Sequence, residues 1–352
     1  MIFDHETLNW LYNNQLGVDE RWSVRTPRGF TWWADRNAQT IEVVGAEVAP
    51  GLPAAHYVSV STDLVHGFAP TDHNLEILNT LLMSFAAMSG PVYEPAGKTL
   101  KLCSMVLVHE DILGWMNPLI SVAAITQIAE ARIMGALVAE ALGGKETLSG
   151  PPGQGLRPVP DDLAEAVALV IAPQGQQPCR WREREFQETV DRYMNKPPSL
   201  GGTAGGLGLT VEFPFGNESS LCRMRGVEPH PRYGNGLFLL QSFPVRGFSE
   251  PEGIRLALSL NAMELTRKSM GYGFGSYAFQ DEMLHFTGFL PNAIYRPGLL
   301  PNLYFACGSR AREMSVRLAR QDWKPESFDL GHSALGRLMS QLAPERSHDH
   351  EA

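Results

Sequence analysis

Histidine and cysteine are the residue types from which a metal site in this chain would be built. Zinc sites commonly place two histidines four residues apart on one helix, or pair cysteines as C-x-x-C. No two of the ten histidines have that spacing, and the four cysteines lie far apart. The sequence therefore predicts no metal site and no disulfide framework, and it leaves reduced thiols at Cys103, Cys179, Cys222 and Cys307.

Two glycine-rich segments have the composition of phosphate-binding loops but not the complete motif. Residues 201–208 read GGTAGGLG, without the lysine of a P-loop, and they lead into a predicted strand at 209–213. A P-loop or a dinucleotide fingerprint opens a helix instead. We therefore predict a flexible loop at 201–208 and a helix-ending turn at 271–277. Since a G-x-S-x-G elbow is also missing, the sequence assigns no catalytic residue and no cofactor.

Four polar or aromatic side chains are candidates for binding. Arg132 and Arg312 stand 180 residues apart in two predicted long helices. Each arginine either contacts an anion or carboxylate, or faces solvent with its stem along apolar surface. Trp32 and Trp33 are neighbours in a predicted strand, so their side chains point to opposite faces. At least one tryptophan is expected in the core, which leaves the other as an exposed anchor for a partner.

The chain contains an internal repeat at an offset of 180 residues. Eleven identities fall between positions 65 and 139 without a gap, whereas chance pairing gives roughly five. The aligned pairs include Gly67 with Gly247, Phe68 with Phe248, Leu78 with Leu258, Met83 with Met263 and Arg132 with Arg312. Each half is predicted to follow the order helix, strands, a Gly-Phe corner, helix, strands and long helix. Two such modules could pack as a built-in dimer.

Hydrophobic periodicity predicts the elements of each half. In the first half we expect a helix at 6–16, a hairpin at 21–34, strands at 40–44, 57–60 and 100–108, and helices at 75–88 and 118–142, the last opened by Pro118. In the second half we expect helices at 186–194, 254–270 and 300–320, and strands at 209–213, 220–224, 236–243, 277–279 and 284–289. Residues 144–180 are predicted to be a linker with one short helix, and 322–352 a C-terminal tail with a weak amphipathic helix near 333–342.

The middle helices at 75–88 and 254–270 are more apolar than packing on one side requires. Their surplus faces need cover, which packing of the two modules would supply. We therefore predict a pseudo-dimer within one chain. The predicted inter-module or partner-binding residues on these helices are Leu78, Leu82, Met83, Phe85, Leu258, Met263 and Leu265.

The order helix, three strands, helix, two strands, helix resembles the type III secretion chaperone-like fold, including its YbjN-like and TY-Chap-type branch. Two copies would stand in tandem, at 1–143 and 181–321. The resemblance implies an α+β fold in which each module is an antiparallel sheet with helices packed on one side. It also implies chaperone-like or protein-binding activity in bacteria. In secretion chaperones the middle helix and its adjoining strand commonly form the dimer interface.

Composition narrows the classes of function. The net charge of −9 argues against nucleic-acid binding, which needs a basic surface. The N-terminus lacks a secretory signal pattern and no apolar run is long enough to span a membrane, so a cytoplasmic location is expected. We predict a non-catalytic protein that binds a protein client, in a bacterial secretion or conflict system. The alternatives are an immunity or scaffold protein, and an enzyme with its site in the cleft between modules.

Overall fold

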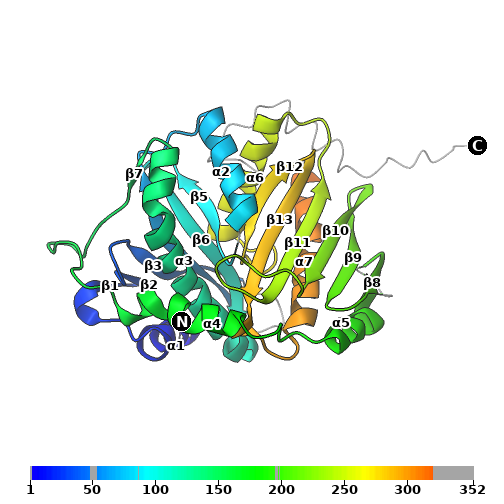
Figure 1. Cartoon of the computed structure of the whole chain (residues 1–352), viewed down its shortest axis with the longest axis horizontal. Coiled ribbons are helices and arrows are strands. Elements are labelled where there is room, and N and C mark those ends of the chain that lie inside the picture. The colour runs from blue at the N-terminus through cyan, green and yellow to red at the C-terminus, as the bar shows by residue number, and fades with distance from the viewer. Residues whose placement is uncertain (1, 48–53, 86, 195–196, 198, 320–352) are drawn as a thin grey trace, which may run out of the picture.

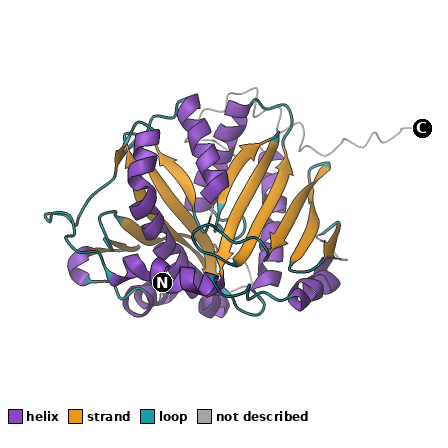
Figure 2. Ribbon diagram, viewed as in Figure 1, coloured by secondary structure: helices purple, strands orange, loops and turns teal. Residues whose placement is uncertain are grey.

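The computed structural model describes residues 2–319 except 48–53, 86, 195–196 and 198. Within this part the chain forms two antiparallel sheets that lie side by side (Figure 1). In the view of Figure 1, α3 (Leu113–Ala141) lies in front of the first sheet and α7 (Leu299–Ala319) behind the second. Figure 2 shows the same alternation of strands and flanking helices. The predicted mixed α+β class with antiparallel sheets is confirmed.

The first sheet has the strand order β1-β2-β3-β4-β6-β5, and a short strand, β7, also pairs with β4. Its predicted strands at 40–44, 57–60 and 100–108 are confirmed within β3, β4 and β6. The strands are β1 (Ser23–Thr26), β2 (Gly29–Trp32), β3 (Gln39–Glu47), β4 (Ala55–His66), β5 (Gly90–Glu94), β6 (Thr99–His109) and β7 (Lys145–Glu146).

The second sheet has the order β8-β9-β10-β11-β13-β12. All five strands predicted for this half are confirmed, within β9 to β13. The strands are β8 (Gly201–Ala204), β9 (Gly208–Phe215), β10 (Glu218–Arg225), β11 (Gly236–Pro244), β12 (Ser276–Gln280) and β13 (Met283–Pro291). When the strands of each sheet are numbered along the chain, both sheets therefore read 1-2-3-4-6-5.

The helices also recur in the same order in the two halves. Each half begins with an α-helix continued by a π-helical turn, has a second helix between its fourth and fifth strands, and ends with a long helix. The remaining helices are α1 (Ile2–Trp10), α2 (Asp72–Phe85), α4 (Ala172–Gly175), α5 (Glu183–Thr189) and α6 (Glu250–Thr266), with π-turns η1 (Leu11–Gln15), η5 (Val167–Ile171) and η6 (Val190–Met194). Short 3₁₀ turns are η2 (Glu20–Trp22), η3 (Glu110–Ile112), η4 (Asp162–Glu165) and η7 (Asn292–Ile294).

The glycine tract at 201–208 is not the flexible loop that its composition predicts. It contains β8, which pairs antiparallel with β9. A Cβ atom on Gly202 would lie 2.2 Å from Met194 Sδ and 3.0 Å from the Thr210 carbonyl oxygen. Glycine is therefore needed there because η6 packs closely on the strand. The extra strand gives four strands before the middle helix, instead of the predicted three.

The Gly-Phe corners adopt the same backbone conformation in both halves. Gly67 and Gly247 have φ angles of 76° and 75°, in the left-handed region that favours glycine. Each precedes a buried phenylalanine, Phe68 or Phe248. The two corners turn the chain from the fourth strand of each sheet into the middle helix, α2 or α6.

Helix α3 begins five residues before the predicted start at Pro118, which lies inside the helix. Proline removes the backbone N–H that would bond to the carbonyl four residues earlier. In this chain that carbonyl belongs to Gly114, and it accepts a hydrogen bond of 2.6 Å from Arg296 Nη1. The second half of the chain thus satisfies the acceptor that Pro118 leaves open, which allows the helix to extend to 29 residues.

The two halves meet where the inner edges of the sheets approach one another. Helix α2 packs on β12 of the second sheet, whereas α6 packs on β5 and β6 of the first. The Asn79 side chain of α2 donates to the Phe279 carbonyl at 2.7 Å and accepts from the Phe279 N–H at 2.9 Å. Met105 and Gly273 exchange two backbone hydrogen bonds. These contacts cover part of the edge of β12 that would otherwise be open to another strand.

The core of the first half contains a neutral hydrogen-bond network beneath α3. Trp32 Nε1 donates to Gln39 Oε1 at 2.9 Å, and Gln39 Nε2 donates to Thr62 Oγ1 at 2.8 Å. Thr62 donates to Gln127 Oε1 of α3 at 2.9 Å, and Gln127 Nε2 donates to Ser104 Oγ at 2.8 Å. All five side chains are buried. The network therefore ties the sheet to its covering helix through uncharged groups.

The core of the second half contains an ion pair instead. Arg310 of α7 is 1% exposed and Glu264 of α6 is fully buried, and Arg310 Nη2 lies 2.8 Å from Glu264 Oε1. Tyr277 donates to Glu264 Oε2 at 2.6 Å, while Arg310 Nη1 donates to Gln241 at 3.3 Å. The guanidinium also lies 3.6 Å from the centre of the Phe286 ring. Buried charges are tolerated when paired and hydrogen-bonded in this way.

Among the described residues, α3 alone has the length and apolar composition of a membrane span. Of its most apolar window, 61% is buried inside the protein. Packing against β4 and β6 accounts for this composition, because a helix covered by a sheet on one side and by the linker on another needs few polar residues.

Candidate functional site

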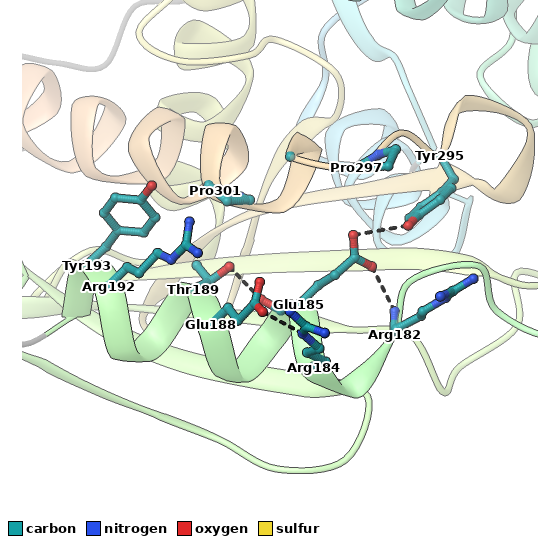
Figure 3. A pocket seen from close by; sticks show the side chains of 11 residues that line it. Arg182, Arg184, Glu185, Glu188, Thr189, Arg192, Tyr193, Tyr295, Pro297 and Pro301 are labelled. Carbon is teal, nitrogen blue, oxygen red and sulfur yellow. Dashed lines mark hydrogen bonds and ion pairs between the residues drawn. The ribbon is translucent and has the colours of Figure 1, made fainter.

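A surface pocket of about 400 Å³ lies between the α5–η6 segment and the start of α7 (Figure 3). This volume is within the range of small-ligand sites. We name it the arginine–tyrosine pocket after the side chains that dominate its wall. It is lined by Arg182, Arg184, Glu185, Glu188, Thr189, Arg192, Tyr193, Tyr295, Pro297, Gly298 and Pro301.

Glu185 fixes the start of α5 and one wall of the pocket. One carboxylate oxygen accepts from the Arg182 backbone N–H at 2.9 Å, and the other accepts from the Tyr295 hydroxyl at 3.1 Å. The first bond satisfies a donor that the helix leaves open at its N-terminus. Partial burial and the hydrogen bond to Glu185 raise the pKa of the Tyr295 hydroxyl. Both oxygens of Glu185 are thus engaged within the protein.

The second carboxylate of the pocket is also engaged. Arg184 Nε lies 2.6 Å from Glu188 Oε1, and this bond lowers the pKa of the Glu188 carboxyl. Arg182 and Arg192 are both exposed, and neither forms an ion pair with another described residue. After its internal pairings the pocket therefore keeps two guanidinium groups available to an anionic ligand.

The first half of the chain and a further arginine support the rim. The Arg180 guanidinium lies 5.1 Å from the centre of the Tyr295 ring. Gly298 sits against Trp115 of α3, since a Cβ atom at Gly298 would lie 3.0 Å from the indole ring. The pocket wall is thereby braced on the rest of the molecule, although its lining residues all come from the second half.

An exposed aromatic and aliphatic surface adjoins the pocket, and we call it the outer patch (Tyr193, Leu200 and Phe305). The Tyr193 ring lies 5.1 Å from that of Phe305, which is 48% exposed. Ser199 donates to the Met194 carbonyl at 2.8 Å, and this bond holds the neighbouring Leu200, 61% exposed, near η6. Large exposed apolar side chains grouped in this way are typical of interaction sites.

The outer patch borders an open sheet edge. β8 is the last strand of the second sheet, and in the part of the chain that the structure describes no further strand pairs with its outer side. Such an edge presents backbone donors and acceptors to which an extended peptide can add as a strand. The pocket, the outer patch and the β8 edge together form one candidate binding region.

The expected tryptophan anchor is wrong. Trp32 is fully buried and Trp33 is 6% exposed, so neither reaches a partner in solution. Trp33 donates to Ser149 Oγ at 2.9 Å, and its carbonyl accepts from Arg157 Nη1 at 2.8 Å. The linker covers the outer side of this strand, a contact between residues more than 100 positions apart. The strand is therefore buried on both faces.

The two equivalent arginines lie in different surroundings. Arg132 of α3 contacts Glu165 of the linker and lies 3.4 Å from the Asp35 carboxylate, so it joins the linker to the first half. Arg312 of α7 is exposed. The two arginines do not form one anion site, and Arg132 is already held by carboxylates of the chain itself.

Of the predicted interface residues, Leu265 lies between the halves. It packs with Ala262 of α6 and with Val92 and Cys103 of the first sheet. Leu78, Leu258 and Met263 are buried. Leu82, Met83 and Phe85 belong to α2, but their side chains lie outside the described part of the structure.

A buried carboxyl also lies at the contact between the halves. Glu130 of α3 accepts from the Tyr233 hydroxyl at 2.8 Å and from Ser89 Oγ at 3.2 Å. Burial raises the pKa of the Glu130 carboxyl, against these hydrogen bonds and the nearby charge of Arg232. Tyr233 stacks with His230, and the His230 ring lies 4.9 Å from that of Phe289.

Sequence reasoning missed the arginine–tyrosine pocket, although a signal was present. Arg180, Arg182, Arg184 and Arg192 fall within 13 positions of an acidic chain. Spacing alone does not show which of them pair internally. The described residues contain no group of three or more His, Cys, Asp or Glu that could hold a metal ion. Comparison with protein-family models, curated proteins and solved structures found no match.

Proposed function

We propose that this chain is a non-catalytic, chaperone-like protein that binds a protein client at the outer end of its second half. The observation that carries the proposal is the juxtaposition of an open strand edge, β8, with the exposed side chains of the outer patch. An extended client segment would add to the edge by backbone hydrogen bonds and bury side chains on the patch. A role in a bacterial secretion or conflict system fits this activity.

We propose further that the chain is a tandem of two related modules that pack as an internal pseudo-dimer. Three observations support it: the shared strand order, the paired left-handed glycines at 67 and 247, and the exchange of contacts by the middle helices. In an isologous interface, each partner gives the same element to the other. Here α2 packs on the second sheet and α6 on the first. This is the arrangement that the secretion-chaperone resemblance implies.

The test is a comparison of client capture by the wild type and two surface variants. Phe305→Ser removes the ring of the outer patch, and Leu137→Ser is a matched control, since Leu137 is 66% exposed on the other long helix. The proposal expects a protein that the wild type and Leu137→Ser retain and Phe305→Ser loses. Equal retention by all three places the site elsewhere.

A parallel screen for turnover of small metabolites addresses the enzyme alternative. The purified wild type is expected to bind without turnover. Saturable turnover, with no protein recovered in the capture experiment, overturns the proposal in favour of an enzyme.

A further inference from the structure

The arginine–tyrosine pocket has a charge pattern that the outer patch does not require. Five of its eleven lining residues are ionisable as Arg or Glu. Glu185 and Glu188 are held by Tyr295, by the Arg182 backbone and by Arg184, so the pocket's carboxylates are already engaged. The start of α7 also faces the pocket through Pro297, Gly298 and Pro301 and adds the positive end of a helix dipole.

The two available guanidinium groups are far apart. Arg182 precedes α5 and Arg192 lies in η6, ten positions later, and Figure 3 shows them at opposite ends of the pocket. A rise of about 1.5 Å per residue places their Cα atoms roughly 15 Å apart. One phosphate or carboxylate group cannot bridge that distance. The spacing fits a ligand with two anionic groups on an extended frame.

We propose that the arginine–tyrosine pocket binds an acidic segment of a protein client, with two carboxylates about four residues apart. An extended chain rises about 3.3 Å per residue, so residues i and i+4 are roughly 13 Å apart and point to the same face. One carboxylate pairs with Arg182 and the other with Arg192. The residue midway between them faces Thr189 and Pro301.

The position of the pocket favours a polypeptide over a nucleic acid. The outer patch and the β8 edge adjoin the pocket, so a client strand can continue from one to the other. The chain as a whole carries a net charge of −9, which disfavours a polyanion of high charge density at long range. This inference rests on the proposed protein-binding function and specifies the client's chemistry.

The test is a fluorescence anisotropy titration of the full chain with a labelled nine-residue peptide, Ser-Ala-Glu-Ala-Leu-Ala-Glu-Ala-Ser. Its control has glutamine in place of both glutamates. Measurements begin at about 20 mM ionic strength, where screening is weak. Arg182→Gln and Arg192→Gln are each expected to weaken binding about fivefold, the usual size of an exposed ion pair. Arg223→Gln, an exposed arginine of β10 outside the pocket, is expected to leave binding unchanged.

Peptides with glutamates two or six residues apart complete the series and are expected to bind more weakly. Three results overturn the proposal: no saturable binding of the acidic peptide, equal binding of the glutamine control, or unchanged binding by the double variant Arg182→Gln/Arg192→Gln. Displacement of the peptide by ATP at lower concentration than by unlabelled peptide also overturns it and assigns a nucleotide site.

The outcome is separable from that of the proposed function. If Phe305→Ser loses a client that the double arginine variant retains with unchanged affinity, binding at the outer patch stands and the acidic-segment proposal fails. If no client is captured and turnover is found, the proposed function fails whatever the peptide does.

Discussion

The two halves of the chain have the same strand order but stabilise their polar interiors differently. The first half joins sheet and helix through neutral side chains, from Trp32 to Ser104. The second uses the ion pair of Arg310 and Glu264. A neutral network loses little when desolvated, whereas a buried ion pair depends on both partners being present. One fold thus accommodates two solutions with very different tolerance to mutation.

The contrast extends to equivalent positions. Glu130 of α3 and Arg310 of α7 are 180 residues apart, and both are buried with opposite charge. The outer ends differ as well. Residues 1–20 contain no lysine or arginine, whereas residues 180–192 contain four arginines. A similar scaffold therefore carries the candidate binding region in its second half only.

The largest expected effect is the loss of one partner of the buried ion pair. Arg310→Met leaves the Glu264 carboxylate buried without its cation and is expected to destabilise the protein by about 3–5 kcal/mol. Urea unfolding followed by circular dichroism measures the change. The double variant Arg310→Met/Glu264→Leu is expected to recover most of the loss. An equally unstable double variant would show that packing, and not the unpaired charge, sets the cost.

A smaller effect is expected for the neutral network. Gln127→Leu removes an acceptor for Thr62 and a donor to Ser104, and it is expected to cost about 2 kcal/mol, the penalty for buried groups that lose hydrogen bonds. The same unfolding assay applies. A loss as large as that of Arg310→Met would contradict the difference drawn between the two cores.

The contact between the halves is tested by Asn79→Ala. The substitution leaves the backbone N–H and carbonyl of Phe279 without their partners and is expected to cost about 1–2 kcal/mol. Asn261→Ala is the matched control, because Asn261 bonds to the Tyr277 backbone on the same strand but from within the second half. If the pseudo-dimer interface is cooperative, both variants unfold in a single transition. Separate transitions in Asn79→Ala alone would indicate that the halves unfold independently.

The smallest expected effect is a pH-dependent gain in stability. Burial raises the folded-state pKa of Glu130, so the stability that its protonated form contributes is present below its unfolded pKa of 4.5 and is lost as pH rises through the folded value. Glu130→Gln is expected to stabilise the protein by about 1 kcal/mol at pH 8. The gain should shrink towards zero near pH 4.5. A gain independent of pH would assign it to packing.

The local features of this fold were predictable from the sequence. The Gly-Phe corners at 67–68 and 247–248 require the left-handed backbone that glycine adopts, and alternation in β9 to β13 reflects one buried face of a sheet. Capping worked as well, since Asp161 accepts from the Leu163 N–H at the start of η4. These features depend on neighbours within a few residues.

The features that were not predictable depend on contacts between distant residues. Trp33 is buried because Ser149 and Arg157 cover it, and Pro118 lies inside α3 because Arg296 occupies the open carbonyl of Gly114. The arginine–tyrosine pocket joins residues 182–193 to 295–301. A sequence pattern shows the arginines, but not which of them remain unpaired.

The central claim, that a client docks at the outer end of the second half, is tested most directly by hydrogen–deuterium exchange of the client complex. The client is the protein that the wild type and Leu137→Ser capture and Phe305→Ser does not. We predict that amides of β8 (Gly201–Ala204) and of the neighbouring segment 199–200 gain protection on binding, while those of β1 do not. Protection confined to the first sheet, or none at β8, would contradict the account.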